Sequence, residues 1–249
     1  LHSITIPTNL TGIGNGALYG CDKLSTIYYN ARDCINIDGT SYVGAFTNPS
    51  GVSAVTVYIG DTVEKLPEDL FFQVEKLSSV ILPNSIEELS FDAFCWGIHF
   101  KAYYEGAENA WANIVKPSWD NTFAYCIYFY ADEQPTVDGN YWHYENNAVK
   151  QWKPVVTFMG VTANGENKTT DSTQLILTFD KSPSDLTAAD ISVSRATKGA
   201  LSGTGSTRTL EISNITVRNG GTVFVNVSPT DEYHIVGGSQ SATGYVKLY

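Results

Sequence analysis

A short motif recurs along the first hundred residues at intervals of about two dozen residues, and this repeat limits the fold more than any other feature. Its first copy places apolar or small residues at Leu1, Ile4, Ile6, Leu10, Ile13, Ala17, Leu18 and Cys21. The middle residues of the successive strand segments are Thr5, Tyr28, Thr56, Ile81 and Tyr103, at intervals of 23, 28, 25 and 22 residues. Self-similarity at such a period predicts a solenoid of stacked coils.

Each coil is predicted to carry one short strand whose apolar residues cannot be buried within a single repeat. Alternate side chains of a strand point to opposite faces, so Ile4 and Ile6 lie together on one face. Stacking buries them against the equivalent residues of neighbouring coils. An Ala-Phe pair such as Ala93-Phe94 adds a small residue beside a large one that packs between coils. We therefore predict a core built from the repeat positions.

The opposite face of the same strands is the candidate binding surface. If Ile4 and Ile6 point inward, Ser3 and Thr5 point outward. The same parity in later strands predicts one row across the sheet, formed by Thr5, Tyr28, Thr56, Ile81, Tyr103 and Tyr128. Exposed Tyr and Ile side chains are suited to protein contacts because they bury much area at low entropy cost. Cross-strand packing alone is the alternative explanation, since Tyr and Thr favour strands in any case.

The repeat resembles that of the BspA-like leucine-rich repeat proteins of bacterial surfaces, whose copies read roughly Leu-x-x-Val-x-Ile-Pro-x-x-Val-x-x-Ile-x-x-x-Ala-Phe-x-x-Cys. The resemblance covers about the first hundred residues, and residues 103–152 are similar to the irregular cap after such repeats. Two features depart from the pattern, an insertion over Asn30–Gly51 and a repeat cysteine retained only at Cys21. The resemblance implies an exported protein that displays a binding surface, often for adhesion to host or neighbouring cells.

Composition changes abruptly near Lys153-Pro154 and predicts two domains. Residues 1–152 carry 7 Lys and Arg against 18 Asp and Glu, whereas residues 153–249 carry 8 of each. All five Trp and all four Cys also precede residue 153. We therefore expect a leucine-rich repeat solenoid over residues 1–152, of α+β class with short strands, turns and little helix, and a separate domain over residues 153–249.

Residues 153–249 alternate apolar and polar side chains in short runs separated by Gly, Asn, Asp and Ser. The predicted strands are 155–158, 175–179, 191–193, 210–212, 223–227 and 245–248. This pattern favours an all-β immunoglobulin-like sandwich. The segments Leu177–Asp180 and Leu186–Ile191 resemble bacterial Ig-like modules that act as spacers in surface proteins.

No constellation for catalysis is visible. The four histidines are scattered, and neither a nucleophile elbow, a zinc-protease helix nor a phosphate loop occurs. Adjacent carboxylates such as Glu87-Glu88 are typical of solvated turns rather than of a glycosidase pair. Asp180, Asp185 and Asp190 could offer oxygen ligands to calcium but lack the spacing of a dedicated loop. We expect a non-enzyme with no cofactor and no metal site.

The predicted cap, about residues 103–152, is rich in aromatic residues. Trp111 and Ile114 share one side of a short predicted helix over residues 108–114 and are expected to close the end of the solenoid. Trp142, Tyr144 and Trp152 are expected to pack nearby, and a sugar-stacking role for them or for Trp119 is the alternative. The cysteines Cys21, Cys34, Cys95 and Cys126 are interpreted as thiols, with a Cys21–Cys34 bridge as the exception to test.

The acidic balance and the resemblance together predict the partners and the location. An acidic solenoid repels phosphate backbones, so nucleic acid is excluded as a partner. The resemblance implies an extracellular or cell-surface protein. No apolar stretch reaches the roughly 18 residues of a membrane-spanning helix, and the chain begins inside an incomplete repeat, so we expect a fragment without its export signal and anchor. The predicted function is adhesion to host extracellular-matrix proteins or other cells. An architectural spacer and a glycan-binding appendage of an exported enzyme are the alternatives.

Overall fold

The computed structural model describes the chain in segments, residues 1–14, 16–18, 20–36, 54–71, 74, 76–90, 93–94, 100–116, 123 and 126–246. It forms two compact units, which we call the first unit (Leu1–Glu133 with Asn140–Gln151) and the second unit (Gln134–Gly139 with Trp152–Tyr249). Strands dominate both, and the helices among these described segments are the four-residue α1 (Glu108–Trp111) and the 3-10 turn η1 (Ala188–Asp190). The expected short strands with little helix are therefore confirmed.

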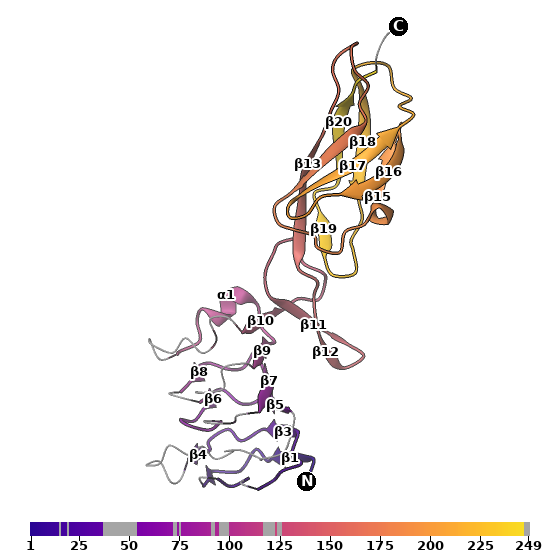
Figure 1. Cartoon of the computed structure of the whole chain (residues 1–249). Coiled ribbons are helices and arrows are strands. Elements are labelled where there is room, and N and C mark those ends of the chain that lie inside the picture. Colours follow the sequence, from indigo (N-terminus) through magenta and orange to yellow (C-terminus); the bar gives the residue numbers. More distant parts are fainter. Residues whose placement is uncertain are drawn as a thin grey trace. The chain divides into compact units, whose positions relative to one another are not determined.

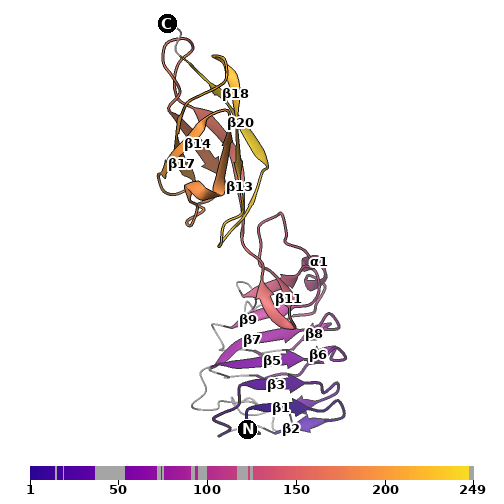
Figure 2. The same ribbon diagram turned by 90° about the vertical axis from the view of Figure 1, so that its right-hand side faces the viewer.

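One eight-stranded sheet organises the first unit (Figure 1). Its strands, in spatial order, are β1 (Ser3–Ile6), β3 (Thr26–Tyr29), β5 (Val55–Ile59), β7 (Leu77–Leu82), β9 (Lys101–Tyr104), β10 (Ile127–Tyr130), β11 (Tyr141–Glu145) and β12 (Ala148–Gln151). Every pair as far as β11 is parallel, and β11 and β12 form an antiparallel hairpin. Spatial order thus follows chain order, as Figure 2 shows for β1 to β9.

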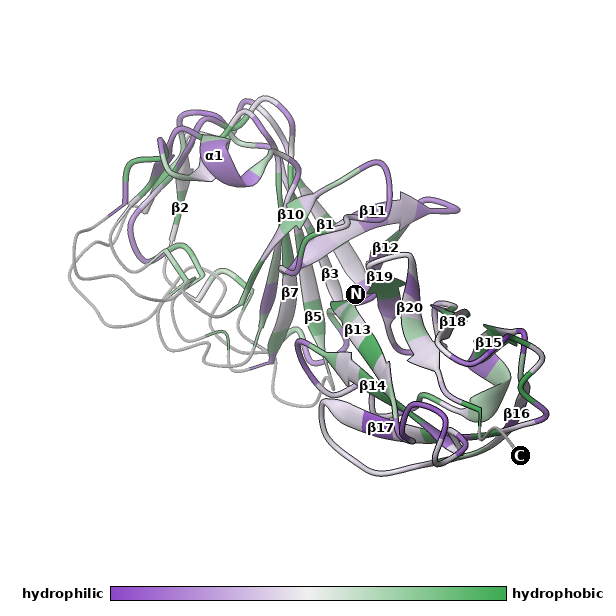
Figure 3. Cartoon of the chain, turned by 90° about the horizontal axis from the view of Figure 1, so that it is seen from above, coloured by the Kyte–Doolittle hydropathy of each residue, from purple (hydrophilic) through white to green (hydrophobic). Residues whose placement is uncertain are grey.

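Two smaller parallel ladders run on another side of the coils. They pair β2 (Gly12–Ile13) with β4 (Ile35–Asn36), and β6 (Lys65–Leu66) with β8 (Glu88–Leu89). Figure 3 looks at the coils from above and shows β2 on one side, the strands of the large sheet on the other, and β11 and β12 leaving that sheet on the side away from β2.

The inward residues of the coils form one continuous core. The strand alternation buries Ile27 and Tyr29, and the same positions are buried in the later strands β5 to β10. The phenylalanines of successive coils are also in contact: Phe71 and Phe94 stack with ring centroids 5.1 Å apart, and Phe94 meets Phe123 edge-on with centroids 5.7 Å apart. Burial of a large apolar side chain contributes about 1.5–3 kcal/mol, so each coil is stabilised mainly by its neighbours.

The chain after the last parallel coil is only briefly helical. α1 ends at Trp111, whereas the sequence predicts a helix as far as residue 114. The Lys116 ammonium donates to the carbonyl oxygens of Trp111 (2.7 Å) and Ile114 (2.9 Å) and lies 4.5 Å from the Trp111 ring centroid. After Trp111 the chain continues in turns that these contacts stabilise. Ile114 is buried, and Trp111 packs against the core.

The second unit is built from two antiparallel-rich sheets. One has the order β16 (Thr197–Ser202), β17 (Thr207–Ser213), β14 (Gln174–Phe179), β13 (Val155–Ala163) and β19 (His234–Val236). The other has the order β15 (Ile191–Ser194), β18 (Gly221–Val227) and β20 (Ser239–Gly244). Alternate residues of both sheets, such as Leu175, Leu177 and Val225, share one buried cluster, so the sheets pack on each other.

The last strand of the second unit differs from the prediction. The apolar run at 245–248 predicts a strand, but β20 occupies Ser239–Gly244, Tyr245 and Val246 are not in a strand, and residues 247 and 248 lie outside the described residues. β20 buries only Ala242 and Gly244, and its six-residue pairing with β18 specifies it. The predicted strands also omit β16 and β19. β16 is almost wholly exposed, so its residues show no alternation of apolar and polar side chains.

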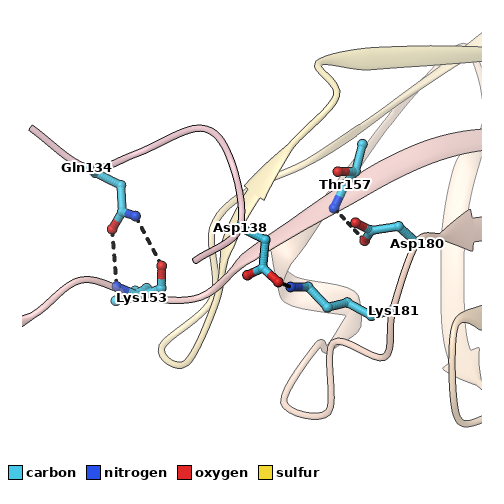
Figure 4. Close-up of polar contacts among 6 residues, drawn as sticks. All are labelled: Gln134, Asp138, Lys153, Thr157, Asp180 and Lys181. Atoms are coloured by element: carbon cyan, nitrogen blue, oxygen red, sulfur yellow. Dashed lines mark hydrogen bonds and ion pairs between the residues drawn. The ribbon is translucent and has the colours of Figure 1, made fainter. Parts of the chain in front are cut away.

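A segment that precedes the hairpin belongs to the second unit. The Gln134 side chain accepts from the backbone N–H of Lys153 (3.3 Å) and donates to its carbonyl oxygen (3.1 Å), and Asp138 forms an ion pair with Lys181 (Figure 4). The compact units therefore differ from a division at 152/153 by assigning Gln134–Gly139 and Trp152 to the second unit.

Candidate protein-binding face

The outward positions of the parallel sheet form a continuous register row. Cα pairing joins Thr5 to Tyr28, Tyr28 to Tyr58, Tyr58 to Ile81, Ile81 to Tyr103 and Tyr103 to Tyr128. We call this set the outer row. It brings together Thr5, Tyr28, Ile81, Tyr103 and Tyr128 of the predicted face, on six successive parallel strands.

Thr56 was predicted in this row, and that placement is wrong. Thr56 pairs with Thr26 on one side and Ser79 on the other, so it lies in the neighbouring row of the same face. The prediction assumed a three-residue strand centred on Thr56, but β5 runs two residues further, to Ile59. Tyr58 has the same outward parity and occupies the position beside Tyr28. The apolar residues at 55, 57 and 59 already indicate that residue 58 points outward.

The neighbouring row is polar and lies beside the outer row along the sheet. It consists of Ser3, Thr26, Thr56, Ser79 and Lys101. The Thr56 and Ser79 hydroxyls are 3.0 Å apart, and Ser78, at a register irregularity, donates to the carbonyl oxygen of Val55 (2.9 Å). The Lys101 ammonium lies 5.7 Å from the Tyr128 ring centroid. The face therefore carries hydroxyl groups beside aromatic rings.

The β11–β12 hairpin covers the later part of the outer row. Ile81 and Tyr103 are only 4% and 8% exposed, because they pack with fully buried Trp142 in a cluster separate from the main core. The Trp142 indole N–H donates to the carbonyl oxygen of Tyr104 (2.9 Å), and the Gln151 amide donates to the Tyr103 hydroxyl (2.8 Å). The expectation that Ile81 and Tyr103 are exposed contact residues is therefore wrong.

The earlier part of the row remains accessible. Tyr28 is 42% exposed and stacks on Tyr58, with ring centroids 5.1 Å apart and planes inclined by 20°. Burial, and then the neighbouring Tyr28, raises the pKa of Tyr58. Its hydroxyl therefore stays protonated at neutral pH and can donate a hydrogen bond to a ligand.

Tyr144 of the hairpin adds a third accessible ring. It is 41% exposed, and its hydroxyl donates to Glu105 Oε1 at 2.6 Å. Burial, followed by the bond to Glu105 and the charges of Glu105 and Asp61, raises the pKa of Tyr144. Glu105 therefore contacts an aromatic side chain of the face, and the charge of Asp61 acts on the same side chain.

A hollow of about 430 Å³ lies between the sheet face and the hairpin. Its walls come from both sides, and the lining residues are Thr56, Tyr58, Ser78, Ser79, Ile81, Tyr103, Asn147, Ala148 and Val149. Asn146 and Asn147 both have positive φ, which allows the tight turn that places Ala148 and Val149 over the sheet. The lining of the hollow thus includes hydroxyl groups as well as aromatic and aliphatic side chains.

The other candidate residues are not brought together into a site. Asp180 accepts from the Thr157 N–H (2.8 Å, Figure 4), Asp185 from the Thr230 hydroxyl (2.7 Å), and Asp190 from the Thr187 N–H (2.9 Å). Each of these carboxylates satisfies local backbone or hydroxyl donors. Within the described segments, no group of three or more His, Cys, Asp or Glu could hold a metal ion.

The cysteines and the proposed sugar-stacking aromatics also have definite positions. Cys21, Cys34 and Cys126 form no disulfide with one another, so the Cys21–Cys34 bridge is absent, and Cys95 lies outside the described residues. Trp142 is fully buried and cannot line a glycan groove, whereas Tyr144 is 41% exposed and Trp119 lies outside the described residues.

Comparison with known proteins identifies the repeat. Residues 1–101 match the family described as the BspA type leucine rich repeat region, in six copies. No curated protein and no solved structure matches the chain. In the described segments no helix is long and apolar enough to cross a membrane. The resemblance of residues 153–249 to Ig-like modules stays a prediction, whereas the similarity of residues 1–101 to BspA type leucine-rich repeats is supported by the family match.

Proposed function

We propose that this chain belongs to a non-catalytic bacterial protein that is displayed at the cell surface or secreted, and that it binds host matrix proteins or other cells. Its first unit acts as a leucine-rich repeat solenoid, and the outward sheet face is the contact surface. BspA-type repeats are commonly surface adhesion or protein-binding repeats, which supports this assignment. The second unit, as an Ig-like sandwich, serves as a spacer.

The accessible Tyr28–Tyr58 stack is the observation that carries the proposal. Both rings lie on consecutive strands of a rigid parallel sheet, so they lose little freedom when a partner covers them. Hydroxyl side chains of the neighbouring row can supply hydrogen bonds around them. Rigid aromatic anchors with adaptable polar groups at their margin are typical of protein contact surfaces.

The test is binding of the whole chain to immobilised extracellular-matrix proteins, comparing wild type with the variant Tyr28→Ser/Tyr58→Ser. We expect affinity to fall by about tenfold or more, since hot-spot aromatics contribute about 2 kcal/mol or more each. Phe224→Ser is the matched control, because Phe224 is 43% exposed and lies in the second unit. Equal loss in both variants, or none in the tyrosine variant, would move the contact surface elsewhere.

An architectural spacer is the second candidate function. Coverage of Ile81 and Tyr103 by the hairpin favours it, because the exposed part of the outer row is shorter than the sequence predicts. A spacer would bind no protein of the panel, and substitutions in the outer row would leave every measurement unchanged.

A further inference from the structure

We propose that the hollow between the sheet face and the β11–β12 hairpin binds an extended, positively charged segment of the partner protein. This inference rests on the proposed function and names the class of partner that the face would take. We call this space the hairpin hollow, lined by Tyr58, Ser79, Ile81, Tyr103, Ala148 and Val149 among others.

The shape of the hairpin hollow suits a single strand of polypeptide. Its volume of about 430 Å³ lies at the small end of ligand sites, and one wall is the parallel sheet while the other is a two-stranded hairpin. Tyr58, Ile81 and Tyr103 line it with apolar surface, and Ser79 and Thr56 add hydroxyl groups. An extended peptide can direct alternate side chains toward the floor and away from it.

The backbone of β12 offers the hydrogen bonds that an extended segment needs. In the part of the chain that the structure describes, β12 is the last strand of the eight-stranded sheet, and its partner is β11. Ala148 and Val149 of this edge strand line the hollow. An edge strand presents N–H and C=O groups on its outer side, and peptides commonly bind by adding a strand there.

Charge selects a basic segment among extended peptides. Residues 1–152 carry 18 Asp and Glu against 7 Lys and Arg. Beside the hollow, Glu105 accepts from Tyr144, and the charge of Asp61 acts on the same tyrosine. A Lys or Arg can lay its aliphatic stem against Tyr58 and Ile81 and direct its charged head toward these carboxylates.

The cations near the hairpin hollow are already engaged. Lys150 of β12 forms an ion pair with Glu145 of β11, at 3.2 Å. Lys101 lies over the Tyr128 ring, at 5.7 Å from its centroid. Both ammonium groups thus have partners, while Glu105 and Asp61 act on Tyr144 of the same hairpin.

The geometry favours a peptide over a neutral glycan. Sugar sites generally present a broad aromatic face for stacking, but Trp142 is fully buried beneath the hairpin and Tyr103 is nearly so. Tyr28 covers one face of the Tyr58 ring by stacking on it. The exposed edge of β12 contributes nothing to stacking on a sugar, whereas its backbone groups can form hydrogen bonds with a peptide.

The probe is a short, end-blocked fluorescent peptide in which Arg alternates with Thr, titrated with the whole chain by fluorescence anisotropy. The same peptide with Glu in place of Arg is the charge control. We expect saturable binding of the Arg peptide, at least about tenfold weaker binding of the Glu peptide, and affinity that falls with added salt.

Three tryptophan variants test the location. Ser79→Trp fills the hairpin hollow, whereas Ser3→Trp places the same side chain at the far end of the same polar row. We expect about tenfold weaker peptide binding for Ser79→Trp and none of this loss for Ser3→Trp. Ala148→Trp fills the hollow from the hairpin side, and it replaces Ser79→Trp in this test if that variant does not fold. Unchanged binding in both hollow variants overturns the inference.

Two charge variants test the preference. Asp61→Asn/Glu105→Gln removes two charges beside the hollow, and Glu64→Gln/Glu68→Gln removes two exposed charges elsewhere in the same unit. We expect about threefold to tenfold weaker binding in the first variant only. Equal weakening in both would mean unspecific attraction to an acidic protein and would overturn a specific site.

The outcomes separate this inference from the proposed function. Matrix-protein binding that is lost in Tyr28→Ser/Tyr58→Ser but retained in both hollow variants leaves the proposed function standing and shows the inference to be wrong. Peptide binding in the hollow without binding to any panel protein supports the inference and removes the adhesion proposal. A neutral oligosaccharide that binds and is blocked by Ser79→Trp, with no competition from the Arg peptide, would show a glycan site instead.

Discussion

Both units consist mainly of β-strands, but the order in which their strands pair differs. In the first unit every parallel strand pairs with the next repeat along the chain, from β1 to β10. In the second unit, strands far apart in sequence meet, as where β13 pairs with β19 and packs on β20. A stacked repeat depends on its nearest neighbours, whereas a two-sheet core depends on all of its strands together.

This difference teaches where a binding face can arise. Tyr28, Tyr58 and Ile81 lie side by side because successive coils direct equivalent strand residues to the same face of the sheet. This alignment needs only contacts between neighbouring coils. In the second unit, exposed apolar residues such as Ile176 and Phe224 lie on different sheets. The repeat architecture therefore produces rows of side chains, and the sandwich produces isolated ones.

Removal of a central phenylalanine is expected to break the first unit most severely. Phe94 stacks on Phe71 and contacts Phe123 edge-on, so Phe94→Ala leaves a cavity shared by neighbouring coils. We expect a loss of about 3–5 kcal/mol in the free energy of unfolding of this unit, measured by denaturant titration with circular dichroism. The transition of the second unit should not move, and a common shift of both would contradict the independence of the two cores.

The converse experiment targets the second unit. Arg208 is buried, and its guanidinium donates to the carbonyl oxygens of Pro183 (2.8 Å) and Gly205. Arg208→Met keeps the apolar stem but leaves these carbonyl groups without that donor, so we expect about 2–3 kcal/mol of destabilisation confined to the second unit. Arg218→Met, at an exposed position, is the control and should change stability by less than about 0.5 kcal/mol.

A smaller effect is expected at the hairpin that covers the outer row. Trp142→Phe removes the indole hydrogen bond to Tyr104 and reduces packing on Tyr103. We expect a loss of about 1–2 kcal/mol and faster amide hydrogen exchange in β12, while exchange in β3 and β5 stays unchanged. Uniform acceleration over all coils would show that the hairpin supports the whole unit rather than covering one face.

High pH should weaken the first unit through its tyrosines. Burial is the main reason that the pKa values of Tyr29, Tyr58, Tyr103, Tyr104 and Tyr144 are raised. Their contribution to stability is complete below the unfolded pKa of about 10 and is lost as pH rises above it, because the unfolded chain then releases protons first. The melting temperature of the first unit should therefore fall between about pH 9 and about pH 11. A constant melting temperature over this range would contradict the burial of these hydroxyl groups.

Much of the repeat could be predicted because its signal is local and recurs. The alternation in Ile4, Thr5 and Ile6 defines an inward and an outward face, and later copies repeat it. The register at β5 could not be read in the same way. The insertion after Asn30 and the longer strand at Val55–Ile59 offered two outward residues, Thr56 and Tyr58, and only backbone pairing selects between them.

The covering of the outer row by the β11–β12 hairpin is a second feature that the period of the repeat does not predict. Trp142 and Gln151 contact Tyr104 and Tyr103 across 38 and 48 residues of sequence. The contact depends on how the hairpin leaves the sheet, where β11 pairs with β10 at Tyr141 and Trp142. The assignment of Gln134–Gly139 to the second unit likewise depends on contacts with Lys153 and Lys181 that composition does not reveal.

The sequence by itself determined the repeat, its strands, the inward core positions and the acidic character of the first unit, because each of these follows from local alternation and side-chain chemistry. Only the tertiary structure decided which tyrosine stands beside Tyr28, which part of the row stays exposed, and where the hairpin hollow opens. These features arise from strand register and from contacts between distant segments, and the pairing of backbone groups sets them rather than the period of the hydrophobic residues.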